Sequence, residues 1–148
     1  MKNPHENYGH SMTNNILISI YPRYMEKIIN KQKNFEFRNF YLTSDPYNIF
    51  WIYETIPTKA LKYKLIVKNP ITKLKKNQHY FLGDDKFEQL VQKGKYAYEI
   101  IHLEEILLPI SLSNLKNLGV TAPQGYAYIK KYPSLVDILE KVELKRIF

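Results

Sequence analysis

The amino-acid sequence predicts an α+β fold, namely a small mixed β-barrel of about five to six strands with short flanking helices. The chain has 148 residues, the length of one ordinary domain, and 45% of them are apolar, which is enough to bury a core. Segments with the periodicity of strands and helices follow in the order strand, helix, strand, strand, strand. This order lacks the regular alternation that a doubly wound parallel sheet needs, so a mixed barrel is the better prediction.

The beginning of the chain predicts a flexible N-terminal extension over residues 1–14, followed by a single domain over residues 15–148. The extension is polar and shows no periodicity. It contains a second methionine, Met12, which is an alternative start, so residues 1–11 need not be native.

The domain is expected to begin with a strand, a helix and a second strand. Ile16–Ile20 is apolar and β-branched, which is typical of a short buried strand. Pro22 then begins a short helix, since proline is tolerated at the first helical position. The segment "NFEFR" alternates phenylalanines with Glu36 and Arg38, so the two charges are expected to share the face opposite the phenylalanines.

Two further strands are expected around a turn. The turn signal "DPYN" leads into the apolar aromatic run "IFWIYET", which predicts a central strand that ends before Pro57. Residues 60–68 alternate apolar side chains with Lys62, Lys64 and Lys68, which predicts another strand. These lysines are expected to face water or a ligand.

The second half of the chain predicts three helices and one or two strands. Residues 69–83 are expected to form a loop, and "GDDKFEQLVQKG" predicts a helix capped by Asp85 and Glu88. Residues 95–110 predict one long strand or two consecutive strands. The segment "SLSNLKNLG" predicts a capped helical turn ending at Gly119, and "PSLVDILEKVEL" predicts a last amphipathic helix.

The composition excludes several kinds of site. The chain has no cysteine, so it cannot form a disulfide, a thiolate zinc site or a cysteine nucleophile. It has no run of about 18 to 20 apolar residues that could span a membrane, so we expect a cytoplasmic protein without a membrane partner. It also lacks a Walker A loop, an HExxH helix, a Gly-x-Ser-x-Gly elbow and a dinucleotide fingerprint. No metal or other cofactor is therefore predicted.

The formal charge of +8 is unevenly distributed. Residues 55–83 contain seven lysines and no acid. Such a block attracts phosphates in a salt-sensitive and sequence-independent way, and Lys73, Lys75 and Lys76 are its candidate phosphate contacts. The alternative is a solvated lysine-rich face in a chain with the codon bias of an AT-rich genome.

The segment "SIYPRYMEKIINKQKNFEFR" at residues 19–38 resembles the opening of ASCH domains, which belong to the PUA-like superfamily. The ASCH pattern is Ser-Ile-x-Pro-x-Tyr, then a helix, then Gly-x-Lys-x-x-Glu-x-Arg. Three further segments resemble ASCH sequences in the family's order, namely "IYETIPTKALKYKLIV", "GKYAYEIIHLEEILLPISL" and "APQGYAYI". Four blocks in order over residues 16–129 are more specific than one short motif.

The chain departs from the ASCH pattern at two positions where the family has glycine. Lys31 stands two residues before Lys33, and Tyr63 or Lys64 stands after the proline-containing segment. If the family's glycines have positive φ, the turns here must change shape or bear strain of about 1 kcal/mol or more. A changed helix-to-strand turn would move Lys33.

The resemblance implies a PUA-like barrel whose first motif lines a cleft, used in relatives to bind RNA or modified nucleotides. Some small ASCH proteins are amidohydrolases that remove an acyl group from modified cytidine, and others have been linked to RNA cleavage. By this resemblance Lys33 and Glu36 are candidate catalytic residues, and Glu54 is a weaker candidate for a second carboxylate. A lysine beside a carboxylate can act as a base or stabilise charge, and a carboxylate can activate water.

Three more residues are candidates for ligand binding. Arg38 offers a planar fork to a phosphate or a base edge. Tyr21 lies next to the motif and can stack on a base. Gln124 lies in a loop and can read a base edge or cap the barrel. Trp51, in an apolar run, is expected in the core.

The charges Lys33, Glu36 and Arg38 have an alternative explanation, an ion-pair network that ties the helix to the barrel. Exposed ion pairs contribute only about 0 to 1 kcal/mol to stability, which favours a ligand site. A concave pocket containing all three would support that site.

Three functions therefore stay open. The first is an RNA or modified-nucleotide binding domain with a basic cleft around the Lys-x-x-Glu-x-Arg motif. The second is a small metal-independent amidohydrolase on acylated cytidine-type nucleosides, or a ribonuclease. The third is a protein-interaction domain.

Overall fold

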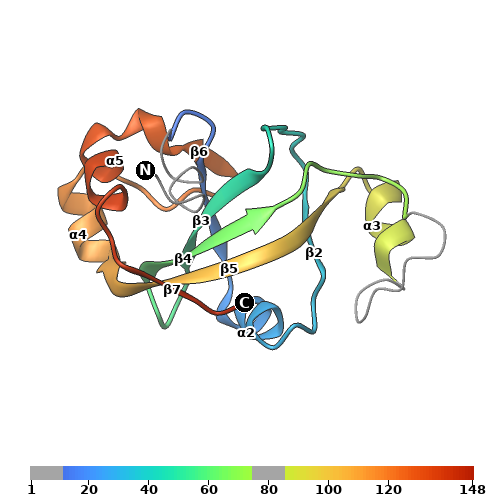
Figure 1. Cartoon of the computed structure of the whole chain (residues 1–148), viewed down its shortest axis with the longest axis horizontal. Helices are drawn as coiled ribbons and strands as arrows, with labels where there is room; N and C mark the ends of the chain where they lie inside the picture. The colour runs from blue at the N-terminus through green and yellow to red at the C-terminus, as the bar shows by residue number, and fades with distance from the viewer. Residues whose placement is uncertain (1–11, 75–85) are drawn as a thin grey trace, which may run out of the picture.

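The structure, a computed structural model, describes residues 12–74 and 86–148 of the chain. Figure 1 shows a curved sheet with short helices around it. The elements are β1 (Ile16–Ile20), α2 (Pro22–Ile29), β2 (Phe35–Arg38), β3 (Asn48–Glu54), β4 (Ala60–Val67), α3 (Phe87–Gln92), β5 (Tyr96–Ser111), α4 (Leu112–Asn117), β6 (Tyr126–Tyr128), the 3-10 helix η3 (Ile129–Lys131), α5 (Pro133–Leu139) and β7 (Leu144–Arg146).

The sheet curls into a half-barrel, so the predicted α+β fold and mixed barrel are confirmed. In the described part of the chain it has seven strands, in the order β2-β5-β4-β3-β1-β6, with β7 paired to β5. The pair β1 and β3 is parallel, whereas the other pairs are antiparallel. The predicted order strand, helix, strand, strand, strand is also confirmed.

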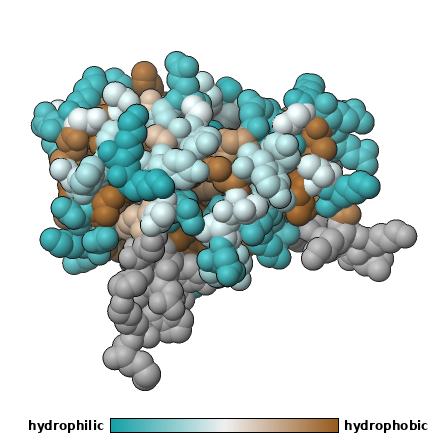
Figure 2. All heavy atoms as spheres, turned by 90° about the horizontal axis from the view of Figure 1, so that it is seen from above, coloured by the Kyte–Doolittle hydropathy of each residue, from teal (hydrophilic) through white to brown (hydrophobic). Residues whose placement is uncertain are grey.

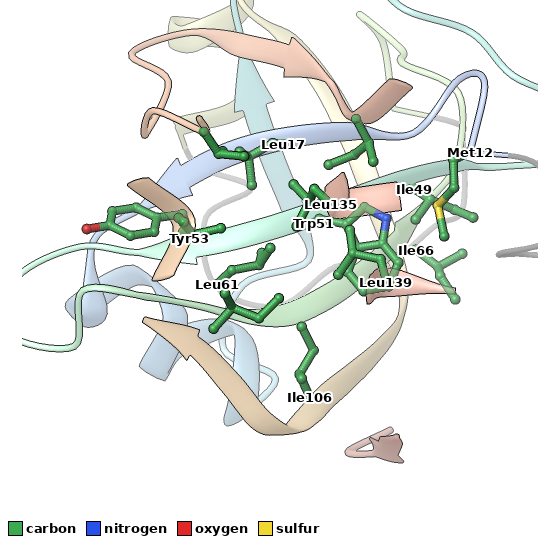
Figure 3. Close-up of a cluster of buried hydrophobic side chains, with 14 residues drawn as sticks. Met12, Leu17, Ile49, Trp51, Tyr53, Leu61, Ile66, Ile106, Leu135 and Leu139 are labelled. Atoms are coloured by element: carbon green, nitrogen blue, oxygen red, sulfur yellow. The ribbon is translucent and has the colours of Figure 1, made fainter. Parts of the chain in front are cut away.

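The central strands β3 and β4 are buried on both faces. On β3, Phe50 and Ile52 pack into one cluster with side chains of α2 and β5. Trp51 and Tyr53 pack into the other cluster with side chains of α4, α5 and η3 (Figure 3). Burial on both faces explains why β3 is a continuous apolar run, and it confirms that Trp51 belongs to the core.

A third, smaller cluster lies between α3 and the strands β2 and β5. Its buried members are Phe35, Phe87 and Ala97, and Phe37 packs against them. The rings of Phe35 and Phe87 meet edge to face with centroids 5.3 Å apart. The phenylalanines of β2 face this cluster. Glu36 and Arg38, the charged residues of β2, therefore face the other way, as the alternation predicted.

Helix α2 begins at Pro22, as predicted, and ends in a Schellman motif. The Gln32 amide donates to the Lys27 carbonyl at 2.8 Å, and the Lys31 amide donates to the Ile28 carbonyl at 3.0 Å. The motif needs a left-handed residue, and Lys31 has a φ of 59°. The turn therefore keeps the shape that glycine would give it, and Lys31 bears the strain.

Helices α3 and α4 end in the same motif, and there the residue in the left-handed conformation is glycine. Gly94 and Gly119 have φ values of 87° and 77°, and α4 is capped by the Ser111 hydroxyl, which accepts a hydrogen bond from the Asn114 amide. The predicted capped turn ending at Gly119 is thus confirmed. The other departure from the ASCH glycines falls inside β4 and carries no such strain, since the non-glycine residues with positive φ in the described chain are Lys31 and Lys59.

Several element boundaries differ from the prediction. Of the two arrangements predicted for residues 95–110, one long strand or two consecutive ones, the structure has one strand, β5. Strands β6 and β7 were not predicted, because three residues are too few to show a period. The last helix ends at Leu139, short of the predicted residue 144. Helix α3 has Lys86 at its N-cap without a side-chain cap bond, and the predicted cap Asp85 lies outside the described residues.

The prediction that the lysines of β4 face water or a ligand is wrong for Lys64. This side chain is only 4% exposed, and its ammonium lies 5.3 Å from the centre of the Trp51 ring and 3.9 Å from the Glu104 carboxylate. Both faces of β4 are covered by other parts of the protein. The alternation of apolar residues and lysines along β4 therefore does not place every lysine in solvent. Burial lowers the pKa of Lys64, and the nearby Glu104 carboxylate opposes this shift.

The packed part of the chain includes Met12, which the sequence analysis placed in the N-terminal extension. Met12 is 5% exposed and belongs to the same cluster as Trp51. Residues 1–11 lie outside the described residues. No helix within residues 12–74 and 86–148 is long and apolar enough to cross a membrane.

Replacing Lys31 by glycine is expected to relieve the backbone strain at this position. Lys31→Gly should have a free energy of unfolding about 1 kcal/mol higher than Lys31→Ala, because only glycine adopts the left-handed conformation without strain. Both variants remove the contact of Lys31 with the Phe148 ring, so the comparison isolates the backbone term. Urea denaturation measures the difference, and an alanine variant as stable as the glycine variant would contradict the assigned strain.

Candidate functional site

A cleft of about 1160 Å³ lies around strand β2. We call it the β2 cleft. Its walls come from the end of β1, the first turns of α2, both faces of β2, the loop at residues 122–125 and the region of α3. It contains Lys33, Glu36 and Arg38, so the three charged residues of the first motif meet in one concave site.

Glu36 is the centre of this charge cluster. Its Oε1 accepts a hydrogen bond from the Lys33 ammonium at 2.6 Å, and its Oε2 accepts one from Arg38 Nη2 at 3.2 Å. Glu36 is 4% exposed, and its two partners are only partly exposed. The ion-pair network that was the alternative to a ligand site therefore exists, and it forms part of the cleft.

Opposing effects determine the ionisation of Glu36. Burial alone would raise the pKa of its carboxyl, but the charges and hydrogen bonds of Lys33 and Arg38 lower that pKa below its ordinary value of 4.5. Glu36 is therefore an anion at neutral pH, and it fixes two cations at the floor of the cleft.

Arg38 also connects β2 to β1 across the open side of the half-barrel. Its Nη2 donates to the Ser19 carbonyl at 3.0 Å, and the Ser19 hydroxyl donates to the Pro123 carbonyl at 2.8 Å. Strand β6 pairs with β1 only at residues 16–18, so the Ser19 carbonyl lies beyond that ladder. These two bonds hold the loop at residues 122–125 beside the charge cluster.

The segment that follows β2 is anchored by Tyr98. The Tyr98 hydroxyl donates to the Phe40 carbonyl at 2.7 Å and accepts from the Leu42 amide at 3.0 Å. Burial raises the pKa of Tyr98 to about 12, so the hydroxyl stays protonated and keeps donating. The Phe40 ring, which lines the cleft, lies 4.7 Å from the Tyr126 ring.

Tyrosines at the start of α2 form an aromatic wall of the cleft. Tyr21 and Tyr24 lie with ring centroids 6.1 Å apart, and the Arg23 guanidinium lies within cation–π distance of both. The Lys33 ammonium lies 5.4 Å from the centre of the Tyr24 ring. Tyr21 is 58% exposed, so one ring of this wall is open to a ligand.

The described residues that line the cleft carry an excess of positive charge. Against the one carboxylate of Glu36 stand five cationic side chains. These are Lys27, Lys33, Arg38, Lys86 and Lys95. Such a surface favours an anionic ligand.

The structure brings most of the predicted site residues together. Besides the three charges, Tyr21 and Gln124 line the cleft. Glu54 does not belong to the lining, and its carboxylate accepts a hydrogen bond from the Thr58 hydroxyl at 2.7 Å. Lys73 is not in the lining either. Lys75 and Lys76 lie outside the described residues.

Sequence reasoning missed other parts of the cleft. Lys27 lies on the polar side of a helix, and Lys86 and Lys95 flank α3, so no local pattern distinguishes them from surface lysines. Tyr53 lies on the central strand β3 and also lines the cleft, and Figure 3 shows its ring pointing away from the middle of the core cluster. Within the described ranges, no group of three or more His, Cys, Asp or Glu residues is placed to hold a metal ion.

Comparison with solved structures identifies the fold. Crystal structures of an ASCH protein from Zymomonas mobilis and of two of its single-residue variants match with TM-scores of 0.64, and 18–19% of residues are identical. The match covers 88% of this chain and 97–99% of those chains. No family model and no curated protein matches the sequence. The chain therefore has an ASCH-like fold of the PUA-like α+β type, as the sequence motifs indicated.

Replacing Glu36 by glutamine is expected to lower the free energy of unfolding. Removal of one partner of an exposed ion pair would change it little. Glu36→Gln leaves two partly buried cations without their carboxylate and should lower the free energy of unfolding by about 1–3 kcal/mol at pH 7. Because the folded-state pKa of Glu36 is lowered, this difference should be fully present above about pH 4.5 and should shrink as the pH falls through the folded-state pKa.

Denaturation at a series of pH values measures this difference. Glu99→Gln is the matched control, since the pair of Glu99 and Lys68 is more exposed and should change stability by less than about 1 kcal/mol. Equal effects of the two substitutions, or a difference that does not depend on pH, would show that the Glu36 network contributes nothing special.

Proposed function

We propose that the β2 cleft binds RNA or a modified nucleotide. The observation that carries this proposal is the cluster of Lys33, Glu36 and Arg38 at the floor of a cleft that has an exposed tyrosine on its wall. Cations supply attraction for phosphates, and an aromatic ring supplies a face on which a base can stack. The two features lie in one cleft, where a single nucleotide can use both.

Glu36 has a positioning role in this proposal. An ammonium has three donors, and Lys33 uses one of them on Glu36, so further donors can serve a ligand. Arg38 is fixed by Glu36 and by the Ser19 carbonyl, which reduces the entropy that a ligand contact would cost. Gln124, in the loop held by Ser19, offers an amide that can read a base edge.

Hydrolysis is the second candidate function, and the close pair of Lys33 and Glu36 favours it. An ionised carboxylate in a cleft can activate water for attack on an amide or assist cleavage of a phosphodiester. Both oxygens of Glu36 already accept hydrogen bonds from cations, which weakens the carboxylate as a base. The binding function is therefore preferred. Incubation with acylated cytidine and with short RNA tests the alternative, and product that forms with the native chain but not with Glu36→Gln would support it.

A protein-interaction domain is the third possibility, and the surface gives it less support. Figure 2 shows, on the face seen from above, hydrophobic side chains in small separate patches among hydrophilic ones. Exposed apolar residues such as Leu108 and Ile56 do occur, but single exposed apolar residues are normal.

Tyr21→Ala is expected to weaken binding of single-stranded RNA. Loss of one stacked base costs about 1–3 kcal/mol in single-strand binders. Tyr21 is 58% exposed, so its removal should leave the unfolding transition nearly unchanged. Fluorescence anisotropy with a labelled oligoribonucleotide measures the affinity, and affinity should also fall as the salt concentration rises.

Tyr41→Ala is the matched control for this experiment. Tyr41 is 60% exposed and does not line the cleft. An equal loss of affinity in both variants, or RNA binding that is indifferent to both, would place the RNA site elsewhere.

A further inference from the structure

We propose that the β2 cleft takes an extended single strand of nucleic acid that crosses the edge of β2, with Lys86 and Lys95 as a second phosphate subsite beside α3. This inference rests on the proposed function and narrows it. The preferred ligand is an oligonucleotide, and a single nucleoside or nucleotide fills only the part of the cleft around Glu36.

The cleft has two parts, because β2 lies between them. Among the residues that the structure describes, β2 is an edge strand that pairs only with β5, and successive side chains along it point to opposite faces. Glu36 and Arg38 line the cleft from one face, whereas Phe35 and Phe37 line it from the other face and belong to the cluster with α3. A ligand that meets both groups of lining residues must therefore pass around the edge of the strand.

The far part of the cleft carries its own positive charge. Lys86 precedes α3 and Lys95 precedes β5, and both line the cleft on the side of the phenylalanines. None of the ion pairs found among the described residues involves either lysine. The near part has a different electrostatic arrangement, since Glu36 neutralises part of the charge of Lys33 and Arg38 there.

Packing holds these lysines in place. Phe87, the residue after Lys86, is 1% exposed and contacts the rings of Phe35 and Phe37 with centroid distances of 5.3 and 5.7 Å. The Lys95 amide donates to the Leu90 carbonyl at 3.0 Å and closes the Schellman motif of α3. The backbones of Lys86 and Lys95 are thus held by these contacts. Ligand binding would therefore have to order only the two side chains.

The size and charge of the cleft favour an extended ligand with several negative charges over a small neutral one. Its volume of about 1160 Å³ lies above the range of about 300–1,000 Å³ that is common for small-molecule pockets. A nucleoside has no phosphate for the five cations, and a mononucleotide has a phosphate at one position only. A single strand brings a phosphate with every nucleotide, and its backbone can follow a basic groove while a base stacks on Tyr21.

The test compares ligands of increasing length with the native chain and two variants. Uridine, uridine monophosphate, a diuridylate and longer oligouridylates are titrated by calorimetry. We expect affinity to rise with each added nucleotide until both parts of the cleft are filled. The double substitution Lys86→Ala/Lys95→Ala should weaken the longer oligouridylates roughly tenfold and leave uridine monophosphate unchanged. It should also lower the slope of log affinity against log salt by about 0.7 for each lost phosphate contact.

Lys93→Ala is the matched control, since Lys93 also lies at the end of α3, is exposed and does not line the cleft. If Lys93→Ala weakened the binding of the longer oligouridylates equally, the loss would come from the overall positive charge of the protein. That result would overturn the proposed subsite. If uridine monophosphate bound as tightly as the longer oligouridylates, the proposal of an extended ligand would be wrong, and the proposed function would stand. Failure of every probe to bind the folded native chain would overturn both.

Discussion

The buried carboxylate of Glu36 is the interaction on which the open side of the half-barrel depends. In the described part of the chain, the sheet runs from β2 to β6 without closing, and β2 shares no ladder with β1. The connection between them is made by Arg38, which bonds to Glu36 on its own strand and to the Ser19 carbonyl on β1. Without the carboxylate, Lys33 and Arg38 would repel each other in a site that water reaches only in part. One anion therefore both holds the two cations together and positions the edge of the barrel.

If the cleft binds a ligand as proposed, this arrangement couples stability and binding at the same residues. Ion pairs on an exposed surface would contribute little to folding. Glu36 is instead almost fully buried, so the choice between a scaffold network and a ligand site does not apply here. The network is part of the scaffold, and its outer atoms form the floor of the cleft. A loss of binding in a variant of this network is therefore informative only together with its stability, whereas exposed residues such as Tyr21 separate the two effects.

The parts of the fold that could be predicted from the sequence are those with strong local signals. Three such features are where they were expected: the proline at the start of α2, the alternation of β2, and the capped helical turn that ends at Gly119. Each depends on a few neighbouring residues. The short strands β6 and β7 depend on partners far away in the chain, and so does the burial of Lys64. The cleft follows the same division. The first motif could be predicted because its spacing is local, but Lys86 and Lys95 join the site only because α3 packs on the phenylalanines of β2.

The departure from glycine at residue 31 shows how such local and distant constraints meet. A residue that avoided the left-handed conformation would have changed the turn and moved Lys33, which stands two residues later. Lys31 adopts a φ of 59° instead, and the two hydrogen bonds that define the Schellman motif are kept. The strain of about 1 kcal/mol is tolerated because the turn is fixed from both sides. Before it, Ile28 is buried in the core, and after it, Lys33 is bound to the buried Glu36. The position of Lys33 in the cleft is therefore set by helix packing and by the carboxylate, and it does not require glycine in the turn.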